Sequence, residues 1–429
     1  MRLGGRLAAA IEVLEDIRTR HRPTADALRD WGVSHRFAGA GDRAAVGNIV
    51  YDALRRKRSA EYLFGSDTPR AAAFGALLLE WDESPQSLNE ALSGDKFAPP
   101  LLSEDEIEAL SANRLDDAPD AVRADVPDWC APFLEAQFGA GWVAEGQALS
   151  ARPPLDLRVN TLKAGRDKVL RELSGMHAAP TAISPNGIRI PPIRGSGRHP
   201  NVQAEPAFRK GWLEVQDEGS QIAAILAGAE PGIQVLDYCA GAGGKTLALS
   251  AGMENRGQIF AHDSEKQRLA PIFDRLRRAD VRNVQVVSRA EDLAPLERKM
   301  DLVLVDAPCT GSGTWRRRPD AKWRLTDRQL DVRMAEQEKI LVEASRFVRP
   351  GGRLTYVTCS MFPQENVERI DAFLVANSDF MPVDHARLFE SRFEGKSGSA
   401  RIDAVKGISL TPAYSGTDGF YVAVLSRAA

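Results

Sequence analysis

The sequence predicts an α/β protein in which a helical N-terminal part precedes a doubly wound parallel sheet. Two observations carry this prediction. After residue 216, short apolar runs rich in β-branched residues alternate with segments of helical length, which is typical of a parallel sheet with helices on both faces. Before residue 90, apolar residues recur instead at spacings of three and four, which indicates helices with one buried face.

The helical part is expected over residues 1–145, including an acidic connector. Its first apolar stripe consists of Leu7, Ile11, Leu14 and Ile17, and further apolar stretches follow over residues 46–54 and 74–81. Ser103 and Glu106 have the spacing of a capping box, which predicts a helix start inside the connector.

A small α+β unit is expected over residues 146–215. Residues 155–159 alternate between apolar and polar as a half-buried strand does, and residues 165–173 have the pattern of a short helix. An Asn186–Gly187 turn precedes a second strand candidate at 188–190.

The sheet of the third part, residues 216–429, is predicted from its apolar runs. We expect its strands at 234–239, 257–263, 283–288, 301–309, 351–360 and 419–426. In such sheets ligands bind where the strands end and the loops begin, so these loops are where chemistry is expected.

Composition excludes several classes of protein. The 429 residues are 43% hydrophobic and 27% charged, as in globular proteins with ample length for more than one core. No apolar run reaches the roughly 18 residues that span a bilayer, and acidic residues interrupt any signal-peptide core near the N-terminus. The four cysteines lie far apart without a CxxC pair, which predicts neither a metal site nor a disulfide framework. We therefore expect a cytoplasmic protein without a metal.

Because the net charge of the chain is slightly negative, any surface that binds nucleic acid must consist of local basic patches. The formal charge of −3 excludes a protein that is basic all over. Residues 1–60, however, carry 12 Lys and Arg against 7 Asp and Glu, a net charge of +5. Alone, such a run indicates a solvated helix face or a linker more often than a binding surface.

A glycine-rich loop follows the first strand of the sheet, and it reads Cys239, Ala240, Gly241, Ala242, Gly243, Gly244, Lys245. Glycines let a backbone approach a ligand closely, and the helix that follows offers free N–H donors. Asp263 ends the next strand, where a carboxylate can accept hydrogen bonds from a ribose. Together these residues predict a site for a nucleoside-containing cofactor.

Two other cofactor classes fit this loop poorly. A P-loop needs a glycine six residues before its lysine, and that position is Cys239. A nicotinamide site needs G-x-G-x-x-G, whereas the loop reads G-A-G-G-K-T.

Two cysteines follow the fourth and fifth strands. The fourth strand ends in Asp306-Ala307-Pro308-Cys309, and the fifth ends in Thr358-Cys359-Ser360. If these strands are neighbours, two thiols and a carboxylate converge beside the cofactor. A lone buried cysteine is usually only a small apolar side chain, but two at adjacent strand ends indicate a reactive site.

These motifs resemble the RsmB/Sun type of RNA cytosine-C5 methyltransferases, which use S-adenosylmethionine. The resemblance covers VLDYCAGAGGKT, HDSEKQRL, DLVLVDAPCTGSGTWRRRPDAKWR, TYVTCSMFPQENVERI and TDGFYVAVL, and upstream LRVNTLK and QDEGSQ. The stretch GAGDRAAVGNIVYDALRRKR resembles the NusB-like RNA-binding domain at the front of such proteins. The resemblance implies a Rossmann-like class I methyltransferase domain, an all-α NusB-like domain and an RNA-contacting α+β unit.

The resemblance also implies roles for individual residues. Cys359 is the expected nucleophile, Cys309 is expected to assist release of the product, and Asp306 is expected to hydrogen-bond the base at N3 in its protonated form. The backbone of residues 239–245, Asp263 at the ribose and Asp306 near the methionine part are expected to hold the cofactor. Lys245 is expected either to organise the pocket or to cap the loop.

One position departs from the family pattern. An acidic residue usually follows the third strand near the adenine, whereas this chain has Ser288-Arg289-Ala290-Glu291-Asp292. Either Glu291 or Asp292 substitutes for it, or the backbone alone holds the adenine.

Residues 309–328 predict an RNA-binding segment. Six Lys and Arg against two Asp give it a net charge of +4, with Trp315 and Trp323 interleaved, and unpaired RNA needs both cations and rings. The RNA contacts we expect are Arg158, Lys163, Arg316, Arg317, Arg318, Lys322 and Arg324.

The predicted function is transfer of a methyl group to C5 of an unpaired cytosine in RNA, with ribosomal RNA as the expected substrate and the chain acting as a monomer. Transfer RNA is the nearest alternative substrate. An exocyclic-amine methyltransferase would not need Cys359, and a non-catalytic RNA-binding assembly factor would need neither cysteine.

Overall fold

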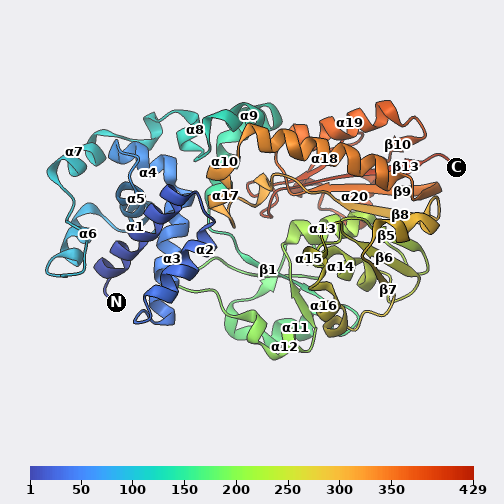
Figure 1. Ribbon diagram of the computed structural model, residues 1–429, viewed down its shortest axis with the longest axis horizontal. Coiled ribbons are helices and arrows are strands. Elements are labelled where there is room, and N and C mark those ends of the chain that lie inside the picture. The colour runs from blue at the N-terminus through green and yellow to red at the C-terminus, as the bar shows by residue number, and fades with distance from the viewer. The chain divides into compact units, whose positions relative to one another are not determined.

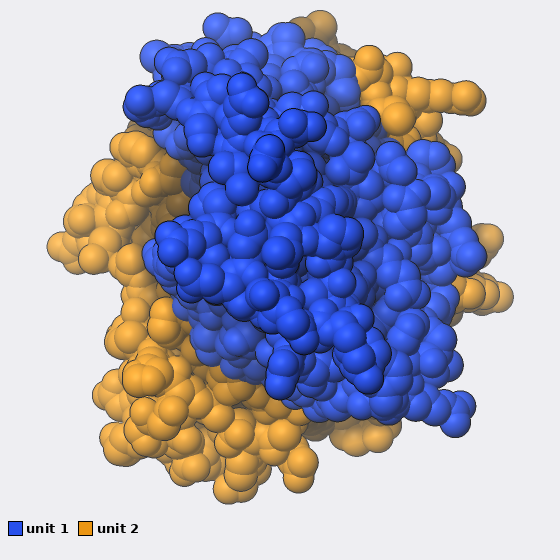
Figure 2. Space-filling view, turned by 90° about the vertical axis from the view of Figure 1, so that its left-hand side faces the viewer, with its two compact units in different colours: residues 1–153, 192–199, 315–325 blue, residues 154–191, 200–314, 326–429 orange.

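A computed structural model describes residues 1–429, which fold into two compact units (Figures 1 and 2). The helical unit consists of residues 1–153, 192–199 and 315–325, and the catalytic unit consists of residues 154–191, 200–314 and 326–429. None of the helices combines the length and the hydropathy that crossing a bilayer requires.

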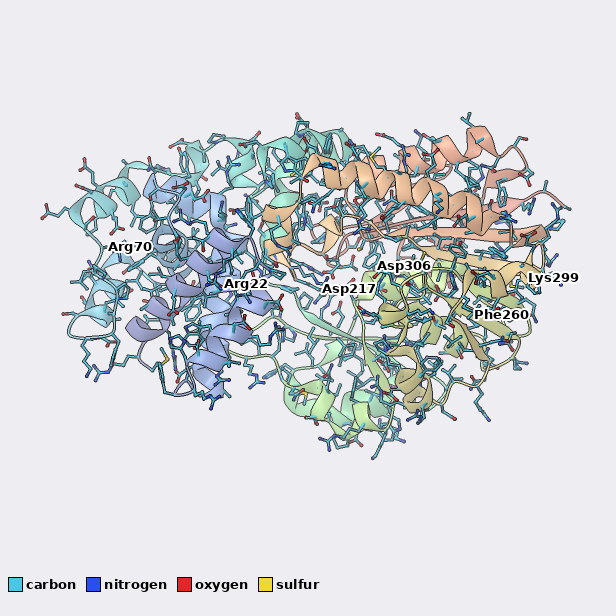
Figure 3. All side chains as sticks on the ribbon, in the orientation of Figure 1. Arg22, Arg70, Asp217, Phe260, Lys299 and Asp306 are labelled. Carbon is cyan, nitrogen blue, oxygen red and sulfur yellow. The ribbon has the colours of Figure 1, made fainter.

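The helical unit is built almost entirely from α-helices. They are α1 (Leu3–Arg20), α2 (Thr24–Ser34), α3 (Ala40–Arg55), α4 (Lys57–Phe64), α5 (Pro69–Glu80), α6 (Pro85–Leu92), α7 (Glu104–Ala112), α8 (Asp120–Arg123), α9 (Ala131–Phe138), α10 (Trp142–Ser150) and α17 (Pro319–Arg324). One apolar core joins the stripes of α1, α3 and α5, which confirms the helices expected from their spacing. The Ser103–Glu106 capping box is present at the start of α7. Arg70 of α5, which is labelled in Figure 3, binds Glu106 at 2.8 Å.

A buried polar network holds this unit together. Asp52 of α3 accepts hydrogen bonds from Arg55, Trp81 and Arg152. The backbone carbonyl of Arg316 accepts from Arg55 Nε at 2.9 Å. Each of these charged side chains is paired, as burial requires, and the network includes residues from the distant segment 315–325.

The catalytic unit contains a nine-stranded mixed sheet. Its strands are β5 (Gln234–Asp237), β6 (Gln258–His262), β7 (Val284–Val287), β8 (Met300–Asp306), β9 (Val348–Thr358), β10 (Phe380–Pro382), β11 (Arg401–Asp403), β12 (Gly407–Leu410) and β13 (Phe420–Arg427). The strand order is β11-β12-β13-β9-β8-β5-β6-β7, with β10 paired to β13. Strands β5 to β9 pair in parallel, and β13 joins β9 antiparallel. The predicted doubly wound sheet is confirmed.

Helices cover both faces of this sheet (Figure 1). They are α13 (Glu218–Ala227), α14 (Gly244–Gly252), α15 (Lys266–Leu269), α16 (Ile272–Ala279), α18 (Asp327–Ser345), α19 (Val367–Ala376) and α20 (His385–Arg392). Helices α13, α14 and α20 share one apolar cluster with the sheet, and α18 and α19 share another. The continuous apolar runs of the central strands follow from this burial on two sides.

The small α+β unit lies within the catalytic unit. Its four-stranded antiparallel sheet has the order β2-β3-β1-β4 and consists of β1 (Leu155–Val159), β2 (Ala179–Pro180), β3 (Gly187–Ile190) and β4 (Leu213–Val215). Helices α11 (Arg166–Glu172) and α12 (Pro206–Arg209) complete it. The two strands expected at 155–159 and 188–190 are confirmed.

Candidate active site

Two neighbouring strands bring the two cysteines together. Strands β8 and β9 run parallel with Asp306 opposite Val357, so the loops that follow them start side by side. Cys309 Sγ and Cys359 Sγ lie 3.4 Å apart. Both side chains are partly accessible, whereas Cys130 and Cys239 are buried. The convergence expected from the sequence is therefore present.

The two thiols differ in their surroundings. The hydrogen bond with Cys359 and burial together raise the pKa of Cys309 well above its ordinary value. Cys309 therefore keeps its proton at neutral pH and is poorly suited to attack as a thiolate.

A close backbone approach fixes the loop after Cys309. Gly313 donates its N–H to the carbonyl of Cys359 at 2.9 Å, and Gly419 donates to the carbonyl of Gly313 at 2.8 Å. A Cβ on Gly313 would lie 2.3 Å from the Gly419 carbonyl oxygen. Only glycine fits there, and the loop is thereby tied to both β9 and β13.

The cofactor loop, residues 239–245, connects β5 to α14. Gly243 has a φ of +82° at the start of the helix, and no side chain caps the N-terminus of α14. Gly241 donates its N–H to Asp263 Oδ2 at 2.9 Å, and Glu265 donates its N–H to Asp263 Oδ1 at 2.9 Å. Asp263 is buried, and its two oriented oxygens still have lone pairs for hydroxyl donors.

Lys245 links this loop to the end of β8. Its Nζ lies 2.6 Å from Asp306 Oδ2 and 5.3 Å from the ring centroid of Phe420. Lys245 is buried, whereas the Asp306 side chain is 36% exposed. Asp306 (Figure 3) is thus a partly exposed acid that forms an ion pair with a buried lysine.

Asp237, which ends β5, is a buried acid that the sequence did not single out. Burial raises the pKa of Asp237 to about 7, although the hydrogen bond from Thr246 acts in the opposite direction. Thr246 Oγ1 donates to Asp237 Oδ2 at 2.7 Å. The hydrogen bond ties the first turn of α14 to the end of the strand.

Glu365 is a second buried acid that sequence reasoning missed, and it lies behind both cysteine loops. It accepts hydrogen bonds from Thr310, which follows Cys309, and from Ser360, which follows Cys359. In the sequence it is the first acidic residue after Cys359, between Gln364 and Asn366, and no motif marks it out.

Three of the expected RNA contacts are wrong, because their side chains are buried. Arg158 is buried, donates to Gln216 Oε1 at 2.6 Å, and burial lowers its pKa to about 10. Lys322 is 1% exposed and donates to Ser150 Oγ at 3.0 Å. Arg316 is 5% exposed. Since these cations bind partners inside the protein, they do not present a charge to RNA phosphates. Trp315 is likewise buried.

The other four expected RNA contacts keep some exposure. Lys163 is half-buried, with Nζ donating to the carbonyl of Arg278 at 3.1 Å. Arg317 is half-buried, and Arg318 and Arg324 are exposed. Arg324 pairs with Asp320 at 2.8 Å.

The residues after β7, which were expected near the adenine, form an exposed ion pair. Arg289 binds Asp292 at 2.7 Å, so Asp292 is engaged at the surface. Glu291 is exposed beside it.

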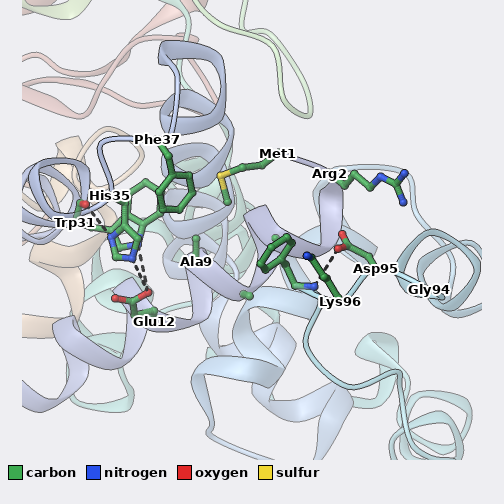
Figure 4. Close-up of a pocket in the computed structure, with 13 residues that line it drawn as sticks. Met1, Arg2, Ala9, Glu12, Trp31, His35, Phe37, Gly94, Asp95 and Lys96 are labelled. Atoms are coloured by element: carbon green, nitrogen blue, oxygen red, sulfur yellow. Dashed lines mark hydrogen bonds and ion pairs between the residues drawn. The ribbon is translucent and has the colours of Figure 1, made fainter.

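A separate hollow of about 800 Å³ lies in the helical unit between α1, α2 and residues 94–97 (Figure 4). Trp31 and His35 stack along it, and the rings of Phe37 and Phe97 are exposed. Arg2 and Lys96 balance Glu12 and Asp95 in its lining. The hollow offers ring surfaces beside charges of both signs and contains no cysteine.

Comparison with known proteins identifies the family of this chain. The family described as 16S rRNA methyltransferase RsmB/F matches residues 223–426, and the ferredoxin-like domain of RsmF/B-like methyltransferases matches residues 126–192. A probable ribosomal RNA small subunit methyltransferase B from Synechocystis is 31% identical over 70% of this chain and 67% of its own length. The chain belongs to the RsmB/F methyltransferase family. The enzyme named ribosomal RNA small subunit methyltransferase B from Pseudomonas syringae is 35% identical over 72% of this chain and 67% of its own length.

Other RsmB/F relatives with that name, such as the one from Citrobacter koseri, are matched over 58% of their own length. Among solved structures, PH0851 covers all of both chains with 26% identity and a TM-score of 0.74. A methyltransferase homologue from Pyrococcus horikoshii covers 72% of this chain and 97% of its own with 26% identity and a TM-score of 0.57. These likenesses confirm the Rossmann-like methyltransferase fold, whose members in this family take their methyl group from S-adenosylmethionine.

Proposed function

We propose that this protein methylates C5 of a cytosine in RNA, with ribosomal RNA as the substrate, through a covalent bond between Cys359 and C6. The observation that carries the proposal is the 3.4 Å separation of the Cys309 and Cys359 sulfurs at the ends of adjacent parallel strands. The names of the relatives support ribosomal RNA as the substrate.

The reaction needs two sulfurs because C5 of cytosine is a weak nucleophile. Addition of the Cys359 thiolate to C6 forms a sulfur–carbon bond and moves electron density to C5. Asp306, protonated once the base is bound, donates a hydrogen bond to N3 and so stabilises the negative charge that builds up on the ring during addition. C5 then attacks the methyl carbon of the donor, whose bond to the sulfonium sulfur breaks and leaves a neutral thioether.

Cys309 acts in the second half of the reaction. Cys309 first gives its own proton to solvent. As a thiolate it takes the proton from C5, the electron pair re-forms the C5–C6 double bond, and the bond from C6 to Cys359 breaks, which releases that sulfur as a thiolate. The hydrogen bond with Cys359 is the largest cause of the raised pKa of Cys309. Once the Cys359 sulfur is bound to C6 as a thioether that cause is weakened, so a larger fraction of Cys309 is thiolate when a base is needed.

The cofactor loop fits S-adenosylmethionine. The N-terminus of α14 carries no side-chain cap, and Asp263 is held by two backbone N–H groups with lone pairs left for ribose hydroxyls. Bound there, S-adenosylmethionine supplies an electrophilic methyl group. Lys245 orients Asp306 at the same edge of the sheet.

RNA binding is assigned to the exposed cations Arg318 and Arg324, with Lys163 and Arg317 at partly exposed positions. The target base has to leave any stack to reach Cys359, so an unpaired segment is favoured. The NusB-like helical unit is proposed to add RNA affinity through its basic N-terminal region.

The test is transfer of labelled methyl from S-adenosylmethionine to unmodified ribosomal RNA and, in parallel, to transfer RNA. We expect label on C5 of cytosine with the wild type, no transfer with Cys359→Ala, and a denaturation-resistant protein–RNA adduct with Cys309→Ala. Undiminished transfer by Cys359→Ala contradicts the mechanism and points to amine methylation. Transfer to transfer RNA alone keeps the chemistry and overturns the substrate.

A further inference from the structure

Glu365 occupies a place in the catalytic unit that the chemistry above does not use. It is 0% exposed and follows β9 in the loop that leads to α19. Oε1 accepts the N–H of Thr310 at 2.8 Å and Gln337 Nε2 at 2.9 Å. Oε2 accepts the hydroxyls of Thr310, at 2.5 Å, and Ser360. A carboxylate has about four lone-pair sites, so all of them are used.

The donors come from both cysteine loops. Thr310 is the residue after Cys309, and Ser360 is the residue after Cys359. Gln337 of α18 also donates to the carbonyl of Pro308 at 2.9 Å, so it holds the residue before Cys309. Each loop is therefore bound to the same carboxylate immediately beside its sulfur.

The position of Glu365 is itself fixed. Its carbonyl accepts the hydroxyl of Tyr356 at 2.7 Å, and the next residue, Asn366, accepts the Thr358 hydroxyl at 2.5 Å and donates to the carbonyl of Ser360 at 2.9 Å. Tyr356 and Thr358 belong to β9. The acid is thus anchored to one strand while it binds the loop of the other.

The geometry points to Glu365 as a positioning residue that sets the distance and direction between the Cys309 and Cys359 sulfurs. Glu365 holds the two loops through its hydrogen bonds with Thr310 and Ser360, and its charge also contributes to the raised pKa of Cys309. The consequence for catalysis rests on the proposed function. If the Cys309 sulfur is displaced, Cys359 can still add to C6, but removal of the C5 proton and release of the product become slower. A misplacement of about 1 Å can cost 10²-fold in rate.

Two readouts separate this role from a structural one. The first uses the protein alone: diamide accepts the two thiol hydrogens as Cys309 and Cys359 form a disulfide, and peptide mapping follows the rate of that cross-link. The second uses RNA: kcat, KM and the amount of denaturation-resistant adduct are measured at steady state.

Glu365→Gln is the conservative variant, because its carbonyl oxygen still accepts two N–H groups while the Thr310 and Ser360 hydroxyls must turn round to accept from the amide. We expect slower cross-linking, a kcat lower by about 10-fold, an unchanged KM for RNA and accumulation of adduct. Glu365→Ala should lower kcat by about 100-fold. Thr310→Val, which loses one hydroxyl only, should shift both readouts in the same direction by less.

Glu368→Gln on the exposed face of α19 is the matched control and should behave as the wild type. Cross-linking at the wild-type rate in Glu365→Gln and Thr310→Val, both folded by circular dichroism, overturns the positioning role. A changed cross-linking rate with no adduct from Cys309→Ala supports the positioning role and overturns the covalent mechanism.

Discussion

Lys245 Nζ of the cofactor loop lies 2.6 Å from Asp306 Oδ2 at the end of β8. The pair joins two edges of the proposed site, one that holds the methyl donor and one that meets the base. A substitution of Lys245 should therefore lower the rate of methyl transfer more than it lowers the free energy of unfolding.

Lys245→Met keeps the length and the apolar stem of the side chain and removes its charge. We expect kcat/KM for methyl transfer to fall by about 100-fold, because Asp306 loses the cation that orients it. The cost in unfolding free energy should be below about 1 kcal/mol, since water can solvate the partly exposed Asp306. Steady-state kinetics and urea unfolding measure the two effects.

Lys339→Met is the control for that change, because Lys339 pairs with Glu343 on the exposed surface of α18 at 3.8 Å. It should leave kcat/KM at the wild-type value. Equal kinetics for Lys245→Met and wild type would show that Asp306 needs no orientation by Lys245.

Gly243→Ala tests the cofactor loop. The φ of +82° disfavours any other residue, and a Cβ would lie 2.5 Å from Ile272 Cγ1. We expect a loss of about 1–3 kcal/mol in unfolding free energy and a loss of S-adenosylmethionine affinity of at least about 10-fold. Urea unfolding and calorimetric titration check both.

The matched control is Gly252→Ala at the other end of α14. Its Cβ would meet only the carbonyl of Ala229 at 3.6 Å, an ordinary contact. It should bind S-adenosylmethionine as the wild type does. Wild-type affinity in Gly243→Ala would exclude this loop from the cofactor site.

Arg318→Ala tests the exposed cations to which we assign RNA binding. If Arg318 meets a phosphate, the variant should weaken binding of unmodified ribosomal RNA across sequences and reduce the slope of log K against log salt by about one. Binding isotherms at several salt concentrations measure this. Lys299→Ala is the control, because Lys299 is exposed just before β8, at the opposite end of that strand from Asp306 (Figure 3). An equal slope change in both variants would count against a specific role for Arg318.

The sequence predicts the site best where local pattern and topology combine. Cys309 and Cys359 could be placed together because each follows a strand, and ends of neighbouring parallel strands share an edge. The glycine-rich loop and Asp263 could be placed for the same reason. Neither inference depends on side-chain packing.

Residues whose role depends on packing could not be predicted. Glu365 is a single acid in the sequence, and only the tertiary structure shows four donors around it. The net charge of residues 309–328 predicts an RNA surface only if all of their cations are exposed. In the structure Lys322 lies instead against Ser150, 172 residues away in the chain, because segment 315–325 belongs to the helical unit.

Lys322 therefore gives a prediction about stability. Burial lowers its pKa to about 8, from 10.5, so the unfolded chain binds more protons than the folded one between these values. Stability should rise with pH across that window, and the full cost of burying the charge is present below pH 8.

Lys322→Met removes the titrating group and keeps the volume. We expect it to raise the unfolding free energy at pH 7 by about 1–3 kcal/mol, the upper value corresponding to the full shift in pKa and the lower one allowing for the lost hydrogen bond to Ser150. The gain should shrink as pH rises above 8 and vanish near the unfolded pKa. Urea unfolding from pH 7 to pH 10 follows this, with Lys339→Met as an exposed lysine that shows no such trend. A gain independent of pH would mean that Lys322 is stabilised in its charged form by its neighbours, and that its burial carries no electrostatic cost.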